Sequence, residues 1–234
     1  AAVSVFGNVI ETQRVPFHGV SFLSCLLTFG GITFGIGNIG TYPFFSIWIA
    51  LPLLIGFLAG AFFIYRQLRE MQPFLELRTF KNRHFTMSVI GSMTLYITTM
   101  SSIVLLPLYV QNIQGYSATV SGLVTLPGSL AMAVISPIAG KIYDKIGMKR
   151  ILLMGTICLV LSNFGMCVIT RTSPIWIPAL LNVFRQAAVG CLLMTFVTWG
   201  TECLQKNHVS HGTVLLTSLR TIAGSAGMSV SVGI

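Results

Sequence analysis

Long apolar blocks separated by short polar segments dominate the sequence. Each block holds about twenty residues or more, and at about 1.5 Å per residue such a helix crosses a hydrocarbon core of about 30 Å. Runs of this length predict transmembrane helices, because a strand or a half-exposed helix would alternate apolar with polar positions. The seven blocks cover residues 19–39, 44–65, 85–110, 118–139, 151–170, 174–200 and 213–234.

The composition excludes an ordinary soluble domain. Hydrophobic residues make up 54% of the chain and charged residues 8%, whereas a soluble domain has about 25% charged residues. The net charge of +9 raises the question of nucleic-acid binding. The basic residues form short clusters between the apolar blocks instead of one patch, however, so they indicate membrane topology and no nucleic-acid partner.

The distribution of basic residues predicts the orientation of the helices. The segment 66–84 carries five Lys and Arg residues and the segment 140–150 carries four, while 40–43 and 111–117 carry none. Loops rich in Lys and Arg stay in the cytoplasm, so the chain is expected to pass up and down through a plasma membrane. The fold class we expect is an all-α polytopic transmembrane helical bundle.

A motif of small and charged residues lies between the fourth and fifth blocks. A glycine is followed four positions later by an aspartate and a basic residue, and then by a second glycine and a basic pair. These residues are Gly140, Asp144, Lys145, Gly147, Lys149 and Arg150. The motif resembles the cytoplasmic signature of the major facilitator superfamily, from which Met148 departs where the family often has a basic residue.

The resemblance implies a conformational switch at this motif. A carboxylate at Asp144 would meet the positive N-terminal end of the next helix and nearby cations, and so act as a latch. The alternative is a solvated basic loop that only sets topology. Both interpretations remain open at the level of sequence.

Further stretches resemble one branch of that superfamily, the fourteen-span drug:proton antiporters of the QacA/EmrB type. They include residues 73–85, the run from Leu106 to Gln111, and Thr198-Trp199-Gly200. The resemblance implies proton-coupled export of drugs or other lipophilic compounds by alternating access. Small lipophilic substrates, protons and membrane lipid are therefore the expected partners. A non-transporting receptor or scaffold of the same fold remains an alternative.

The resemblance also implies how the chain is divided, with a major facilitator fold that is only partly present. Residues 1–17 would end a preceding span and form a cytoplasmic loop, and 18–65 would be spans seven and eight. Residues 66–84 would form a second cytoplasmic loop, and 85–234 a truncated C-terminal half with spans nine to thirteen. We expect the N-terminal half of the same transporter to complete the substrate path.

Arg185 is the basic residue deepest inside an apolar block. Placing an arginine at mid-membrane costs ~2.5–3.5 kcal/mol, so its side chain should face the bundle interior or a wet cavity. It could handle substrate or protons, or form a structural hydrogen bond between helices. The candidates for a substrate or proton path, chosen as polar residues within spans, are Tyr96, Thr99, Asn182, Arg185, Gln186 and Thr195.

All five acidic residues lie in loops or at the ends of spans: Glu11, Glu70, Glu76, Asp144 and Glu202. The acid that couples transport to protons is therefore expected upstream. No His, Asp or Glu stands at mid-span, which argues against a membrane-embedded enzyme. We expect no metal or cofactor, because the five cysteines lack paired spacing and His208 and His211 lack further ligands.

Overall fold

The computed structural model describes residues 19–39, 42–43, 46–69, 77–171, 173–204 and 209–232, which form helices joined by short turns and contain no strand. The predictions for residues 1–17, Glu11, Glu70, Glu76 and His208 lie outside them. The α-helices are α1 (Gly19–Gly37), α2 (Ile47–Arg69), α3 (Arg83–Leu108), α4 (Ala118–Ile146), α5 (Met148–Cys167), α6 (Trp176–Glu202) and α7 (Val209–Val232). A 3-10 turn, η1 (Leu77–Lys81), precedes α3, and a π turn, η2 (Tyr109–Ile113), follows it.

All seven apolar blocks form helices, and six of these helices are long and apolar enough to cross a membrane. The polytopic helical bundle predicted from the sequence is thereby confirmed. The seventh helix, α7, is less apolar because it contains Arg220 and many serines and glycines. It packs between α1 and α3, away from the ends of the molecule, and its role as a span remains a prediction.

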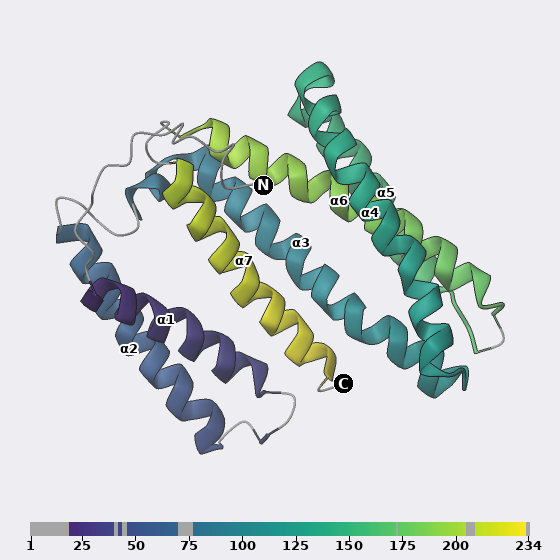
Figure 1. Cartoon of the computed structure of the whole chain (residues 1–234), viewed down its shortest axis with the longest axis horizontal. Coiled ribbons are helices and arrows are strands. Elements are labelled where there is room, and N and C mark those ends of the chain that lie inside the picture. Colours follow the sequence, from purple (N-terminus) through teal and green to yellow (C-terminus); the bar gives the residue numbers. More distant parts are fainter. Residues whose placement is uncertain are drawn as a thin grey trace, which may run out of the picture.

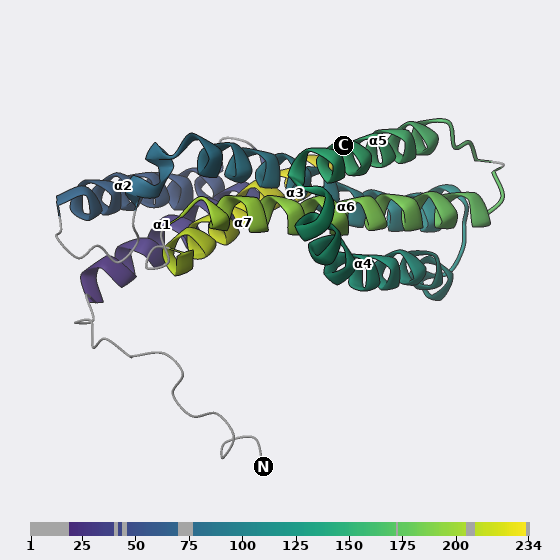
Figure 2. The same cartoon turned by 90° about the horizontal axis from the view of Figure 1, so that it is seen from above.

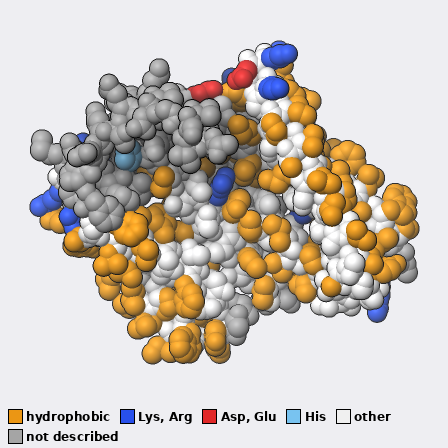
Figure 3. All heavy atoms as spheres, in the orientation of Figure 1, with side chains coloured by type: hydrophobic (Ala, Val, Ile, Leu, Met, Phe, Trp, Pro, Cys, Tyr) orange, Lys and Arg blue, Asp and Glu red, His pale blue; other side chains and the backbone are white. Residues whose placement is uncertain are grey.

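The helices form a row (Figures 1 and 2). The pair α1 and α2 occupies one end, α7 and α3 lie in the middle, and α6 crosses from α3 to α4 and α5 at the other end. Hydrophobic side chains cover the outer flanks at both ends of the row (Figure 3). Phe57 on α2 and Phe164 on α5 are 65% and 68% exposed. Such surfaces suit contact with lipid tails.

Close helix contacts in the bundle depend on small residues. A side chain at Gly31 of α1 would come within 2.8 Å of the Pro52 carbonyl oxygen and 3.0 Å of the Gly56 Cα atom on α2. A side chain at Gly227 of α7 would come within 2.6 Å of the Ile97 carbonyl oxygen on α3. Small residues allow helix backbones to approach closely in lipid, where packing replaces the hydrophobic effect. These two seams therefore hold α1 to α2 and α3 to α7.

The main difference from the predicted elements is at the end of α4. The fourth block was expected to end near residue 139, with a loop carrying the motif. The helix instead continues to Ile146, and α5 begins at Met148. Polar residues extend a helix once it leaves the membrane core, so the apolar block underestimates its length. Gly140, Asp144 and Lys145 accordingly lie on the last turns of α4.

Candidate functional site

Gly147 is the single residue that separates α4 from α5. Its φ is 78° and its ψ is 162°, a backbone conformation that is essentially restricted to glycine. Its N–H donates to the Tyr143 carbonyl and closes the last turn of α4 at 3.0 Å. The second glycine of the motif therefore creates an abrupt turn, which sets the direction in which α5 re-enters the bundle.

Tyr143, on the last turn of α4, connects the motif to α6. Its side chain is 8% exposed, and its hydroxyl donates to the Glu202 carboxylate at the C-terminal end of α6 with an O–O distance of 2.6 Å. A hydrogen bond to an ionised acceptor is stronger than one between neutral groups. The ends of α4 and α6 are thus joined at the predicted cytoplasmic face.

The same end of α6 is also joined to α3. The side-chain amide of Asn82 donates to the Cys203 carbonyl at 2.9 Å, while its oxygen accepts the His84 N–H at 3.0 Å and caps α3. The rings of His84 and Trp199 meet edge to face, with centroids 5.5 Å apart. One asparagine thereby satisfies groups at the termini of two helices that would otherwise lack partners.

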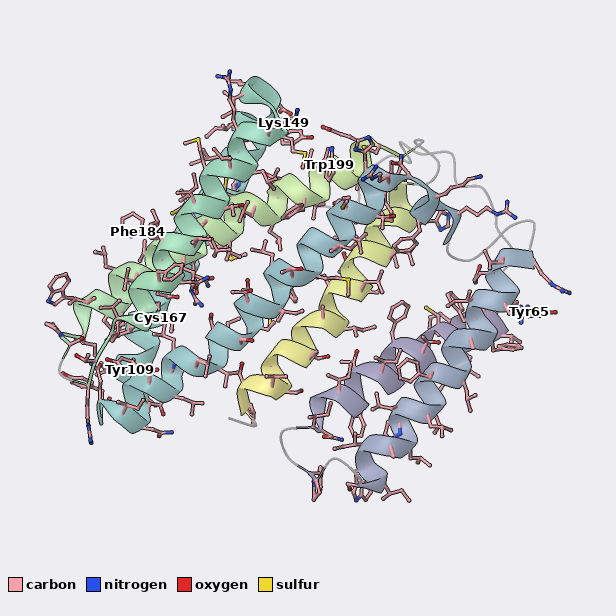
Figure 4. The ribbon with its side chains drawn as sticks, turned by 180° about the vertical axis from the view of Figure 1, so that it is seen from behind. Tyr65, Tyr109, Lys149, Cys167, Phe184 and Trp199 are labelled. Atoms are coloured by element: carbon pink, nitrogen blue, oxygen red, sulfur yellow. The ribbon has the colours of Figure 1, made fainter. Side chains whose placement is uncertain are left out.

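These contacts define a cluster at one end of the bundle, which we call the inner cluster: Asn82, His84, Tyr143, Trp199 and Glu202. In Figure 4, Lys149 and Trp199 lie at this end, whereas Tyr109 and Cys167 lie at the opposite end. Just outside the span, the pKa of the Cys203 thiol is raised by burial and, secondarily, by the Glu202 carboxylate. A thiol in this state is a weak nucleophile.

Asp144 differs from the expectation of a latch within the motif. Its side chain is exposed, and it makes no hydrogen bond or ion pair with any residue that the structure describes. It follows Tyr143 on the helix and so points away from the contact with Glu202. The basic residues Lys145, Lys149 and Arg150 are exposed as well. At this end of the bundle, the hydrogen bond that the structure describes between α4 and α6 is made by Tyr143 and not by Asp144.

Three of the polar residues expected along a path come together on α6. Asn182, Arg185 and Gln186 are 2%, 5% and 9% exposed. One guanidinium nitrogen of Arg185, Nη2, donates to the Asn182 side-chain oxygen at 2.9 Å. Arg185 Nε and the Gln186 side-chain oxygen have no hydrogen-bond partner among the described residues. Unpaired polar atoms in a buried position are costly, so this site can accept a further polar group.

Asn182, Arg185 and Gln186 have different surroundings on their two sides. On the α4 side, a side chain at Gly128 would come within 2.5 Å of the Asn182 amide nitrogen. On the other side, Arg185 borders a cavity of about 340 Å³ with Tyr109 of η2 and Asn163 and Cys167 of α5. The cluster therefore lies between a tight contact of Asn182 with α4 and, on the Arg185 side, an open space toward α3 and α5.

The other three candidate residues do not join this cluster. Tyr96 on α3 instead stacks under Arg220 of α7, whose guanidinium carbon lies 5.1 Å from the ring centre. The hydroxyls of Thr99 and Thr195 each donate to a carbonyl of their own helix at 2.8 Å. The path predicted from polarity alone is thus divided into an Arg185 cluster and a separate pair on α3 and α7.

Tyr143, Glu202 and Asn82 were not singled out by the sequence as contact residues. A signal was present, because the ends of the fourth and sixth blocks were both predicted to be cytoplasmic. It was not specific enough to identify which side chains would meet.

Comparison with known proteins identifies the class to which this bundle belongs. The profile of the Major Facilitator Superfamily matches residues 64–228, from the end of α2 through most of α7. The chain therefore belongs to the Major Facilitator Superfamily. The family resemblance predicted from the motif is confirmed, and the chain is a multi-pass membrane protein, which in a bacterium lies in the plasma membrane.

Individual relatives cover nearly the whole chain. Lincomycin resistance protein LmrB of Bacillus subtilis is 30% identical over 99% of this chain and 49% of its own length. Multidrug export protein EmrB of Escherichia coli is 28% identical over 96% of this chain and 44% of its own length. An MFS-type transporter of Bacillus subtilis, YhcA, is 29% identical over 98% of this chain and 43% of its own length. The chain spans less than half the length of these curated relatives.

Proposed function

We propose that the protein is a secondary active transporter that exports drugs or other lipophilic compounds in exchange for protons. Membership of the Major Facilitator Superfamily supports transport, and relatives named for lincomycin resistance and multidrug export support this substrate class. The observation that carries the proposal is the Arg185 cluster, a buried cation with unpaired donor capacity in the middle of a membrane helix.

In this proposal the chain supplies one side of the transport path. Residues 18–65, which contain the hairpin of α1 and α2, are the two helices added between six-helix halves, and residues 85–234 belong to the C-terminal half. The rest of the path and the acids that bind protons come from an N-terminal half. The positions of Asp144 and Glu202 support this division, because neither described acid lies at mid-span.

The proposed mechanism uses two parts of α6 differently. In the middle of the helix, Arg185 and Gln186 offer a donor and an acceptor to a substrate or to a polar group that relays protons. At the inner end, the bond between Tyr143 and Glu202 keeps α4 and α6 together while the halves rock around a central site. Asp144, Lys145, Lys149 and Arg150, exposed beside this bond, are available to contact the opposite half when the cytoplasmic side closes.

The test is transport by the full-length protein in proteoliposomes. With an imposed pH gradient, a lipophilic fluorescent dye should move across the membrane faster than in protein-free vesicles, and a protonophore should abolish the difference. Gradient-independent movement would contradict proton coupling. Movement no faster than in empty vesicles, tested with several lipophilic dyes and lincomycin, would contradict the export function.

A further inference from the structure

A second cavity, of about 570 Å³, lies between the α1–α2 hairpin and α7, away from the Arg185 cluster. Its wall contains Phe29 of α1, Ala61 and Leu68 of α2, Phe80 of η1 and Leu219 of α7. The one hydroxyl in its lining, on Thr28, already donates to the Ser24 carbonyl at 2.6 Å. Water needs two or more polar partners to occupy a cavity, so this space suits hydrocarbon.

The cavity is accessible from the surrounding membrane. Several residues of α2 that line it are also among the exposed hydrophobic residues, including Phe57 at 65%, Ile64 at 50% and Leu68 at 51%. All three lie on a helix that is long and apolar enough to span the bilayer. A lipid tail can therefore enter sideways from the hydrocarbon region without crossing a polar surface.

The end of the cavity toward the predicted cytoplasmic face is basic. Leu68 and Phe80 line this end, and their neighbours in the chain are Arg69 and Lys81, both with exposed side chains. Arg69 lies over the ring of Tyr65, with its guanidinium carbon 4.5 Å from the ring centre. The segment 66–84 contains five Lys and Arg residues against two Glu, a net charge of +3.

We propose that this cavity binds an anionic phospholipid, with an acyl chain between the α1–α2 hairpin and α7 and the phosphate near Arg69 and Lys81. Apolar lining beside a basic end matches an amphiphile with an anionic head group. Basic pockets between membrane helices on the cytoplasmic side bind lipids of this class. The bound lipid fills the gap that the hairpin leaves beside α7.

Native mass spectrometry of the purified full-length protein tests this proposal, with phosphatidylglycerol and phosphatidylcholine of identical acyl chains as probes. The wild-type protein should retain phosphatidylglycerol in preference to phosphatidylcholine. Equal retention of both would overturn the anionic assignment. Retention of neither would show that another part of the protein or an apolar compound fills the space, and would overturn the proposal.

Two pairs of variants locate the lipid. Ala61→Trp fills the cavity and should reduce retention of phosphatidylglycerol at least tenfold. Ala50→Trp, the control, makes the same change on α2 outside the lining and should leave retention unchanged.

The second pair tests the basic end of the cavity. Arg69→Gln with Lys81→Gln should weaken retention of phosphatidylglycerol by about fivefold for each cation removed. Lys141→Gln with Arg171→Gln removes two cations elsewhere and should change it less than twofold. Wild-type retention by both Ala61→Trp and the Arg69/Lys81 variant would overturn the site.

Discussion

The hydroxyl of Tyr143 donates to the carboxylate of Glu202 at 2.6 Å and joins the ends of α4 and α6. Tyr143 stands directly before Asp144, the carboxylate that the motif singled out. These two adjacent residues on the last turn of α4 therefore have different surroundings. Tyr143 is buried against α6, while Asp144 is exposed and can contact a partner that is not part of the described bundle.

The first prediction concerns the bond itself. Tyr143→Phe keeps the buried ring but removes the donor, which leaves the Glu202 carboxylate without this partner. We expect the free energy of unfolding to fall by ~1.5–3 kcal/mol, the usual contribution of a hydrogen bond to a charged group. Hydrogen–deuterium exchange should become faster at the C-terminal ends of α4 and α6, where the bond lies, and stay unchanged at their N-terminal ends. Glu202→Gln, which keeps an acceptor, should have a smaller effect; unchanged exchange in Tyr143→Phe would contradict the role of the bond.

The second prediction tests whether Asp144 contributes to transport without contributing to the stability of the fold. Asp144→Asn keeps the size of the side chain but removes its charge. Since Asp144 has no partner among the described residues, membrane insertion and thermal stability should be unchanged, whereas export by the full-length protein should fall severalfold. Export assays at matched expression check this. Wild-type export would leave the motif with a role in topology alone.

The third prediction concerns Arg185. Arg185→Lys keeps the charge but loses the planar guanidinium that bonds Asn182, and Arg185→Ala loses both. We expect both variants to insert normally and to lose at least tenfold in export rate. Arg171→Ala, at an exposed position near the outer end, is the control and should export normally. Wild-type export by Arg185→Ala would end the proposal that this residue handles substrate or protons.

The fourth prediction compares the two glycines of the motif. Gly147→Ala forces a side chain into a backbone conformation that costs ~1–3 kcal/mol. A side chain at Gly140 would meet the Met194 Cε atom at 3.6 Å, an ordinary contact, so Gly140→Ala should be tolerated. Thermal unfolding in detergent should show a lower midpoint for Gly147→Ala only. Equal midpoints for the two variants would show that the turn can relax.

The fifth prediction concerns the 234 residues expressed alone. Alternating access in this superfamily requires two halves that rock around a site between them. If this chain provides one side of that site, it should move no lipophilic dye faster than empty vesicles do under an imposed pH gradient. Gradient-dependent movement by this chain alone would overturn both the proposed division of the path and the upstream location of the coupling acids.

Much of the fold could be predicted because, in a membrane, the residues of a segment alone decide whether it forms a spanning helix. A helix that satisfies its own backbone must be about twenty apolar residues long, so each span is visible as a block. The family could be recognised for a similar reason, because Gly140, Asp144 and Gly147 lie within one short segment. The turn at Gly147 likewise depends on a single residue and its backbone.

Only the tertiary structure decided which side chains meet, because those contacts depend on how distant helices pack. Polarity alone grouped Tyr96 and Thr195 with Arg185, but packing directs Tyr96 to Arg220 and leaves Thr195 bonded within its own helix. The sequence placed Glu202 at the end of a span and Tyr143 in the polar segment after the fourth block. Their bond exists because α4 and α6 cross there, and the cavity beside Leu219 exists because α1 and α2 pack on each other more closely than on α7.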